Sequence, residues 1–249
     1  MQLSPGYREW APPAPLRDAV ACVWSQVVGT EPAGGRDVWV LPDACSDLIW
    51  HQGLGAVVAG PDTSAWHAPL APGTVLVGVR FRPGAGGPAL RVPLVEVRNQ
   101  RVLVADLVRP LRAALPGDLP VEAALARLVD AAARLVDDGP PDGAVLAAAR
   151  LLADPALRLP ALTDRLGISE RHLRRRFHDT VGYGPKTLQR VLRLRTFVRR
   201  AAEGDSDLAG LAAAAGYADQ AHLTRECRDL TGVTPSVLAG RGSTSWPPG

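Results

Sequence analysis

The sequence contains few of the features that mark several large classes of protein. Its three cysteines, Cys22, Cys45 and Cys227, are far apart and odd in number, so we expect neither a close-spaced zinc site nor a disulfide framework. No apolar run reaches the roughly 18 residues that a membrane-spanning helix needs. The first residues lack the basic and then apolar pattern of an export signal. We therefore expect a cytoplasmic protein with no membrane partner.

Motifs that would indicate an enzyme are also scarce. Cys45, His51 and His67 are metal-ligating residue types, but no close pair anchors them, so we expect no metal or other cofactor. The glycines of PGAGG are not followed by the Lys and Ser or Thr of a phosphate-binding loop. A cupin-like catalyst would need clustered histidines, and a DNA alkyl-transfer protein would need a four-cysteine zinc site. The enzyme hypothesis is therefore only the alternative, and bound metal on the purified protein would revive it.

The composition is that of a globular protein with two domains. The chain has 249 residues, of which 47% are apolar and 21% charged. Short β-branched and aromatic runs, separated by Pro and Gly, predict an antiparallel β barrel or sandwich in residues 1–105. In residues 74–82, Val75, Val77, Val79 and Phe81 alternate with Leu76, Gly78, Arg80 and Arg82, which is typical of a half-buried strand.

Later segments are rich in Ala, Leu and Arg at helical spacing. We expect a helical connector at 106–144, an all-α domain at 145–240 and a flexible tail at 241–249, which makes the fold class α+β. Glycines after helical runs, such as Gly167, Gly182, Gly204, Gly216 and Gly232, predict helix ends. The all-α domain is predicted to contain two helix-turn-helix units joined by one long helix.

Charge is distributed unevenly along the chain. Residues 1–149 hold 12 Lys or Arg against 15 Asp or Glu, whereas residues 150–249 hold 16 against 10. Ten of the basic residues lie between 169 and 200. A basic cluster of this density is typical of a surface that binds a phosphate backbone.

The C-terminal part contains an internal repeat with an offset of 50 residues. HLRRRFHDTVGYGPKTL at 172–188 aligns with HLTRECRDLTGVTPSVL at 222–238, with identities that include His172 and His222, Arg175 and Arg225, and Gly182 and Gly232. The repeat indicates that one supersecondary unit occurs twice. The helix between them, 186–202, would be about 25 Å long at 1.5 Å per residue. The two repeated helices could then lie about one DNA turn, about 34 Å, apart.

On a helical wheel each repeated helix has an apolar side and a side rich in hydrogen-bond donors. A single Arg-rich face is more often merely solvated, but the duplicated positions indicate a geometric requirement. Arginine on such a helix suits the major groove, where it can bond to guanine. The expected DNA-binding residues are Arg171, Arg174, Arg175 and His178 on helix 169–181, and Gln220, Ala221, Thr224, Arg225 and Arg228 on helix 219–231.

This repeat, with GYADQAHLTRECRDLTGVTPS at its end, resembles the DNA-binding region of the AraC/XylS family of transcription regulators. The resemblance covers about residues 145–240. It implies base contacts by Arg171, Arg174 and Arg175 in the first unit and by Gln220, Ala221, Thr224 and Arg225 in the second; Ala221 could contact only a thymine methyl. The family usually has aromatic residues at the positions of Leu223 and Cys227, which leaves the rigidity of the second unit open.

The N-terminal stretches LPDACSDLIWH and VGVRFRPGAGGPALRVPLVEVRNQRVLVADL resemble, more loosely, the β-rich regulatory domain of a subset of that family. The resemblance implies control by a small-molecule effector or dimerisation. The residues that we consider for effector binding are Trp39, Asp47, Trp50, His51, Arg80 and Arg82, with an anionic effector as one hypothesis. In the alternative interpretation, the tryptophans form core and the arginines pair with carboxylates.

The function predicted from these observations is a sequence-specific transcription regulator. Its expected partner is double-stranded promoter or operator DNA, and RNA polymerase, an effector and a second copy of the chain are further partners under consideration. A scaffold with vestigial DNA binding is a further alternative. The salt dependence of binding to DNA would distinguish it, because neutralisation of phosphates makes affinity fall steeply with salt.

Overall fold

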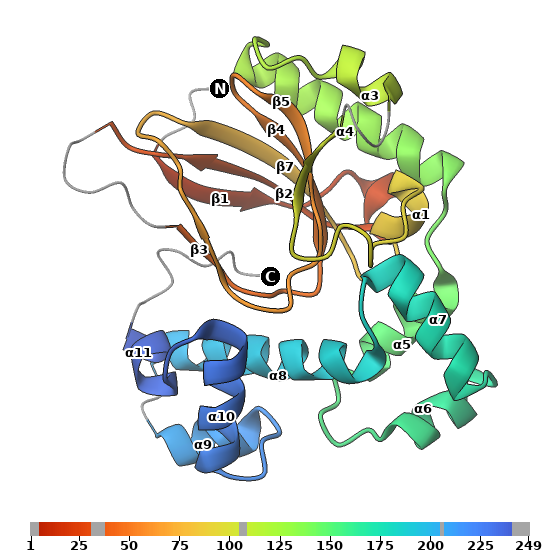
Figure 1. Cartoon of the computed structure of the whole chain (residues 1–249), viewed down its shortest axis with the longest axis vertical. Helices are drawn as coiled ribbons and strands as arrows, with labels where there is room; N and C mark the ends of the chain where they lie inside the picture. The colour runs from red at the N-terminus through yellow and green to blue at the C-terminus, as the bar shows by residue number, and fades with distance from the viewer. Residues whose placement is uncertain (1–4, 31–37, 105–108, 205–206, 241–249) are drawn as a thin grey trace.

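The computed structural model describes residues 5–30, 38–104, 109–204 and 207–240. In the N-terminal half, six antiparallel strands form one sheet (Figure 1). Its order is β1 (Gly6–Trp10), β2 (Val20–Val27), β7 (Val75–Phe81), β4 (Ser46–His51), β5 (Gly55–Ala59) and β8 (Arg101–Leu103). A second sheet pairs β3 (Val38–Val40) with β6 (Trp66–Ala68). Within the described residues the edge strands β1 and β8 do not pair, so the sheet is not closed into a barrel. Of the two predicted forms, the sandwich is the one that remains.

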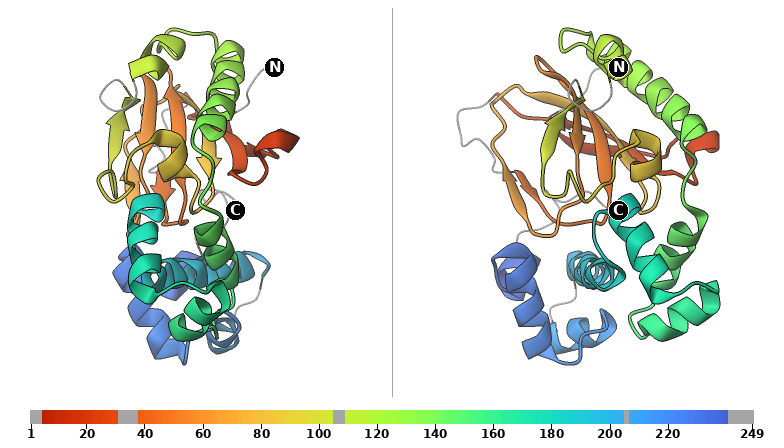
Figure 2. Two further views of the ribbon diagram at one scale, coloured as in Figure 1. Left: turned by 90° about the vertical axis from the view of Figure 1, so that its right-hand side faces the viewer. Right: turned by 45° about the vertical axis from the view of Figure 1, so that its right-hand side comes forward.

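One face of the large sheet is covered by helix α4 (Val121–Asp138), as the left view of Figure 2 shows. Val77, Val79 and Phe81 of β7 are completely buried in a core that they share with Leu128 of α4. Val77 and Val79 thus face the helix as the alternation predicts, but Gly78 and Arg80 on the other face are buried too, so the prediction of a half-buried strand was wrong. Most of the expected connector thus packs on the sheet. Shorter helices complete this half: η1 (Ala14–Leu16), α1 (Gly86–Leu90) and α3 (Arg109–Ala114).

The C-terminal half is entirely helical within the described residues. Its helices are α5 (Gly143–Leu151), α6 (Leu159–Leu166), α7 (Glu170–Val181), α8 (Pro185–Ala202), α9 (Leu208–Ala214), α10 (Gln220–Thr231) and α11 (Pro235–Gly240). Two cores form, one around α5–α7 and one around α9–α11, and α8 contributes Leu188 and Val191 to the first and Leu194 and Phe197 to the second. The long helix thus joins two separately packed units. The expected tail, 241–249, lies outside the described residues.

The two repeated helices begin and end in the same way. The side chains of Ser169 and Asp219 accept hydrogen bonds from the backbone N–H groups of His172 and His222. Such caps satisfy N–H groups that have no partner inside the helix. Gly182 and Gly232 end the helices in the left-handed conformation, with φ of 86° and 74°. The repeat therefore fixes equal helix lengths at both sites.

The two halves touch along the ends of both helical units. The N–H of Leu94 donates to the carbonyl oxygen of Asp179 at 2.8 Å, and the N–H of Ala65 donates to that of Leu230 at 2.7 Å. Leu41 is buried in the core of the second unit. The β-rich half is therefore in contact with the C-terminal ends of both α7 and α10.

None of the helices that the structure describes is long and apolar enough to cross a membrane. The same residues contain no group of three or more His, Cys, Asp or Glu side chains placed to hold a metal ion.

Candidate nucleic-acid interface

Helix α7 has a buried apolar side and an exposed basic side. Leu173 and Phe177 are completely buried. Arg171, Arg174 and Arg175 are exposed, and His178 is half-buried. Within the described part of the chain, none of the three arginines forms an ion pair. Their guanidinium groups are therefore available to an external partner.

Helix α10 has the same division in the second unit. Leu223 and Cys227 are completely buried, so residues smaller than aromatics still fill this core. Gln220, Ala221, Arg225 and Arg228 are exposed, and Thr224 is half-buried, with its hydroxyl donating to the carbonyl oxygen of Gln220 at 2.8 Å. Neither arginine has an ion pair with a described residue. The structure thus places the predicted residues of this unit on one helix, on the side away from its core.

The first unit is attached to α5 by a bidentate ion pair. The guanidinium of Arg176 donates to both carboxylate oxygens of Asp142, at 2.7 and 2.6 Å. The same carboxylate caps α5 by accepting from the N–H groups of Ala144 and Val145. A fork-shaped pair of this kind fixes orientation as well as distance. It therefore holds α7 at a set angle to α5.

The second unit has an ion pair that sequence reasoning missed. Arg190 of α8 donates to Glu226 at 2.8 Å and to Asp229 at 3.2 Å, both on α10. Glu226 is 9% exposed and directly precedes the buried Cys227. This pair supplies a specific link between α8 and α10.

The spacing of the two basic faces is set by α8, which lies between the units (Figure 1). The helix has 18 residues, which corresponds to about 27 Å at 1.5 Å per residue. Both views in Figure 2 show the helical units on the side of the molecule opposite α4. The long helix thus holds the two arginine-bearing helices apart at a fixed distance.

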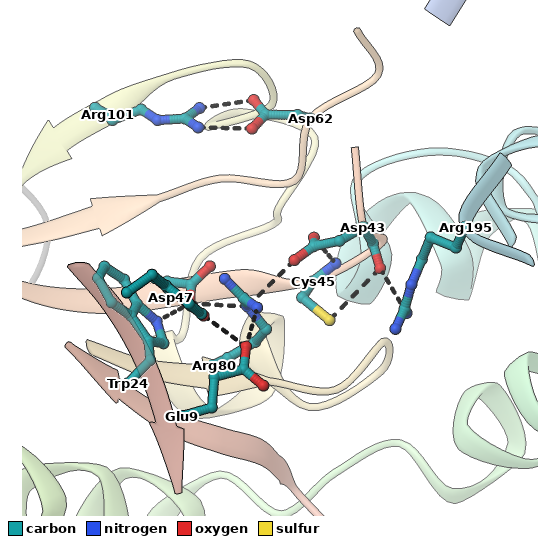
Figure 3. Close-up of polar contacts among 10 residues, drawn as sticks. Glu9, Trp24, Asp43, Cys45, Asp47, Asp62, Arg80, Arg101 and Arg195 are labelled. Carbon is teal, nitrogen blue, oxygen red and sulfur yellow. Dashed lines mark hydrogen bonds and ion pairs between the residues drawn. The ribbon is translucent and has the colours of Figure 1, made fainter. Parts of the chain in front are cut away.

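In the N-terminal half, the expected effector residues fall into separate places. Arg80 is 7% exposed, and it forms ion pairs at 3.2 Å with Glu9, Asp43 and Asp47 (Figure 3). The indole of Trp24 donates to Asp47 at 2.7 Å. Burial raises the pKa of Asp47 to about 6, although the charge of Arg80 lowers it. Arg80 is therefore paired with carboxylates of the protein, as in the alternative to effector binding.

The other four expected residues do not join this cluster. Trp50 lies on the opposite face of the sheet, completely buried, with its indole donating to the carbonyl oxygen of Pro116 at 2.8 Å. Arg82 follows the end of β7 and donates to the carbonyl oxygen of Arg17. Trp39 contacts His67 edge-on and packs on the second helical unit. His51 is half-buried at the end of β4, with its ring within hydrogen-bonding distance of the carbonyl oxygen of Gln52.

The charged cluster is connected to the helical half through Asp43. While its carboxylate pairs with Arg80, its carbonyl oxygen accepts a hydrogen bond from Arg195 of α8 at 3.1 Å (Figure 3). The N–H of Cys45 donates to the same carboxylate at 2.9 Å. Asp43 therefore links the charged cluster around Arg80 directly to α8, the helix that separates the two basic faces.

Two helix-turn-helix units with exposed arginine faces, joined by one helix, define a DNA-binding protein. Residues 162–241 match a family model described as a helix-turn-helix domain, and residues 8–103 match one described as a domain of unknown function. The C-terminal half therefore contains a helix-turn-helix domain of the AraC type, as the resemblance of its sequence implies.

Comparison with solved structures finds ToxT from Vibrio cholerae. The P21 crystal form has 9% identity and a TM-score of 0.49, over 94% of this chain and 98% of that chain. ToxT bound to (E)-4-(8-methylnaphthalen-1-yl)but-3-enoic acid has 10% identity and a TM-score of 0.47, over the same shares. ToxT bound to an unsaturated fatty acid has 10% identity and a TM-score of 0.43, over 87% and 93%. Comparison with curated protein sequences gives no match.

Proposed function

We propose that this regulator binds its operator by inserting α7 and α10 into successive major grooves of one duplex. The observation that carries this proposal is the repeated exposure of two arginines, Arg175 and Arg225, which lie at equivalent positions 50 residues apart and have no ion pair with any residue that the structure describes. Arginine can donate two parallel hydrogen bonds to guanine O6 and N7. The nine residues predicted on these helices are the proposed DNA contacts, and Ala221 contributes only apolar contact.

Selection of bound sites from a random DNA pool gives the first test. Two conserved blocks about one helical turn apart are expected among the selected sequences. Arg175→Ala should then weaken binding to the selected site by about 1 to 3 kcal/mol and relax the preference at one base pair. Arg199→Ala, at the exposed end of α8, is the control, because loss of a phosphate contact weakens all sequences alike. Equal and sequence-independent effects of the two substitutions would contradict base recognition by Arg175.

We further propose that the β-rich half makes DNA binding responsive to a small-molecule effector. The support is the path from the Arg80 cluster through Asp43 to Arg195 of α8. Arg80 already has three carboxylate partners, so an anionic effector there would have to displace one of them. Repeating the site selection with and without metabolites from a cell extract tests this proposal, and identical affinity and sites under both conditions would count against it.

A further inference from the structure

A basic cavity lies where the β-rich half meets the first helix-turn-helix unit. Its volume is about 310 Å³, and three cations line it: Arg98 from the loop before β8, Arg174 from α7 and Lys186 from the first turn of α8. His178 also lines it, and Glu170 is its one carboxylate. The excess of positive charge suits an anion.

The basic side chains of this cavity have no competing partner in the described part of the chain. Arg98, Arg174 and Lys186 form no ion pair and no side-chain hydrogen bond there. All three side chains are exposed, so an external anion can reach them. The cavity therefore gathers three cations that no described side chain neutralises.

The backbone that carries Arg98 is held by contacts with both halves. Leu94 donates to Asp179 at the end of α7, and Asn99 donates to the carbonyl oxygen of Pro61 at 3.1 Å. The loop packs so closely on Gly60 that a Cβ there would lie 1.8 Å from the carbonyl oxygen of Val97. Because the loop is fixed, an anion bound by Arg98 would order only its side chain, which lowers the entropic cost of binding.

The position of the cavity indicates which anion it binds. Arg174 belongs both to the cavity and to the exposed side of α7, so DNA lying on α7 would pass the mouth of the cavity. The cavity also includes the start of α8, an 18-residue helix whose N-terminal dipole favours negative charge. We propose that a backbone phosphate of the bound DNA occupies this cavity, so that the β-rich half contributes Arg98 directly to the DNA interface.

This inference rests on the proposed binding of α7 to DNA, and it adds a contact from outside the helix-turn-helix domain. The proposed contact makes DNA affinity depend on how the two halves are docked, since Arg98 reaches the phosphate only while its loop stays on α7. Removal of Arg98 should therefore weaken all DNA sequences alike, because a phosphate contact carries no sequence information.

Fluorescence anisotropy with the selected operator, over a series of salt concentrations, tests the contact. Arg98→Ala should weaken binding about tenfold at low salt and should reduce the slope of log affinity against log salt by about 0.9, the value for one phosphate. Arg127→Ala is the matched control, because Arg127 is an exposed arginine on α4, on the opposite side of the molecule. It should leave both quantities unchanged.

Replacing single phosphates of the operator by neutral methylphosphonates identifies the contacted group. One replacement should weaken the wild-type protein about tenfold and have little further effect on Arg98→Ala, because both changes remove the same interaction. If every replacement weakens the two proteins equally, or if Arg98→Ala keeps the wild-type salt slope, the inference is overturned. In that case a loss of base preference in Arg175→Ala would still support the proposed function. A wild-type protein that selects no DNA would instead overturn the proposed function itself.

Discussion

A methyl group added at Gly182 tests how closely the β-rich half packs on the first helix-turn-helix unit. Gly182 and Gly232 end the two repeated helices at equivalent positions, and both have positive φ. A Cβ at residue 182 would lie 2.6 Å from Cγ of Pro61 and 3.0 Å from the carbonyl oxygen of Leu94, whereas one at residue 232 would have no atom within 4 Å. Only the first substitution combines backbone strain with overpacking.

Comparison of the two glycines separates the cost of backbone strain from the cost of overpacking. Alanine in the left-handed conformation costs about 1 kcal/mol, and an extra methyl group in a close-packed site costs about 1 to 3 kcal/mol more. We expect Gly232→Ala to lower the free energy of unfolding by about 1 kcal/mol and Gly182→Ala by about 2 to 4 kcal/mol. Urea denaturation followed by circular dichroism measures both. Equal losses from the two substitutions would refute the packing of Pro61 and Leu94 against this turn.

Three further predictions concern buried charges. Arg190→Ala leaves Glu226 buried without the arginine, so it should lower the free energy of unfolding by about 2 kcal/mol. Arg200→Ala, on the exposed end of α8, is the control and should change it by less than about 0.5 kcal/mol. Comparable losses from the two substitutions would argue against the ion pair. Asp142→Ala removes both the cap of α5 and the ion pair with Arg176, whereas Asp142→Asn keeps a side-chain oxygen for the cap. Thermal denaturation should therefore show that alanine lowers the free energy of unfolding by about 1 kcal/mol more than asparagine does. The reverse order would count against this double role of Asp142. The raised pKa of Asp47 means that the folded protein retains a proton which the unfolded chain has lost, so stability falls as pH rises from about 4 to 6. Relative to Asp47→Asn, the wild type should lose about 2 kcal/mol between pH 4.5 and 6.5 in urea denaturation, and a difference independent of pH would contradict the shift.

The helical half was largely predictable because its signals are local. Ser169 and Asp219 stand directly before the repeated helices, and Gly182 and Gly232 directly after them, so the predicted bounds 169–181 and 219–231 differ by one residue from those observed. A cap or a left-handed turn depends on a few neighbouring residues. The helix bounds could therefore be inferred without knowledge of the tertiary structure.

The order and pairing of the strands in the β-rich half were harder to predict from the sequence than the helix bounds. The short β-branched and aromatic runs that predicted β structure contain β2, β3, β4, β5 and β7, whereas β1, β6 and β8 are short and lack a clear alternation. Pairing of β2 with β7 joins segments about 50 residues apart, and no local pattern encodes such a pairing. The ion pair between Arg190 and Glu226 was missed for the same reason.

One error could have been avoided with the sequence alone. Asp47 and Trp50 were considered for the same effector site, yet they are three residues apart in a single strand. Successive side chains of a strand point to opposite faces, so residues separated by an odd number cannot share one face. The structure accordingly places Asp47 in the charged cluster and Trp50 in the core beneath α4.

The repeat preserves one outward arginine, Arg175 and Arg225, but not the way in which the two helices are anchored. Residues 176 and 226 are equivalent, yet one is an arginine bound to Asp142 and the other a glutamate bound to Arg190. A chimaera carrying α7 in place of α10 would put two guanidinium groups against each other at α8, and the reciprocal exchange would oppose two carboxylates. The duplicated units are therefore not interchangeable modules, and each helix can be transplanted only together with the residue that neutralises it.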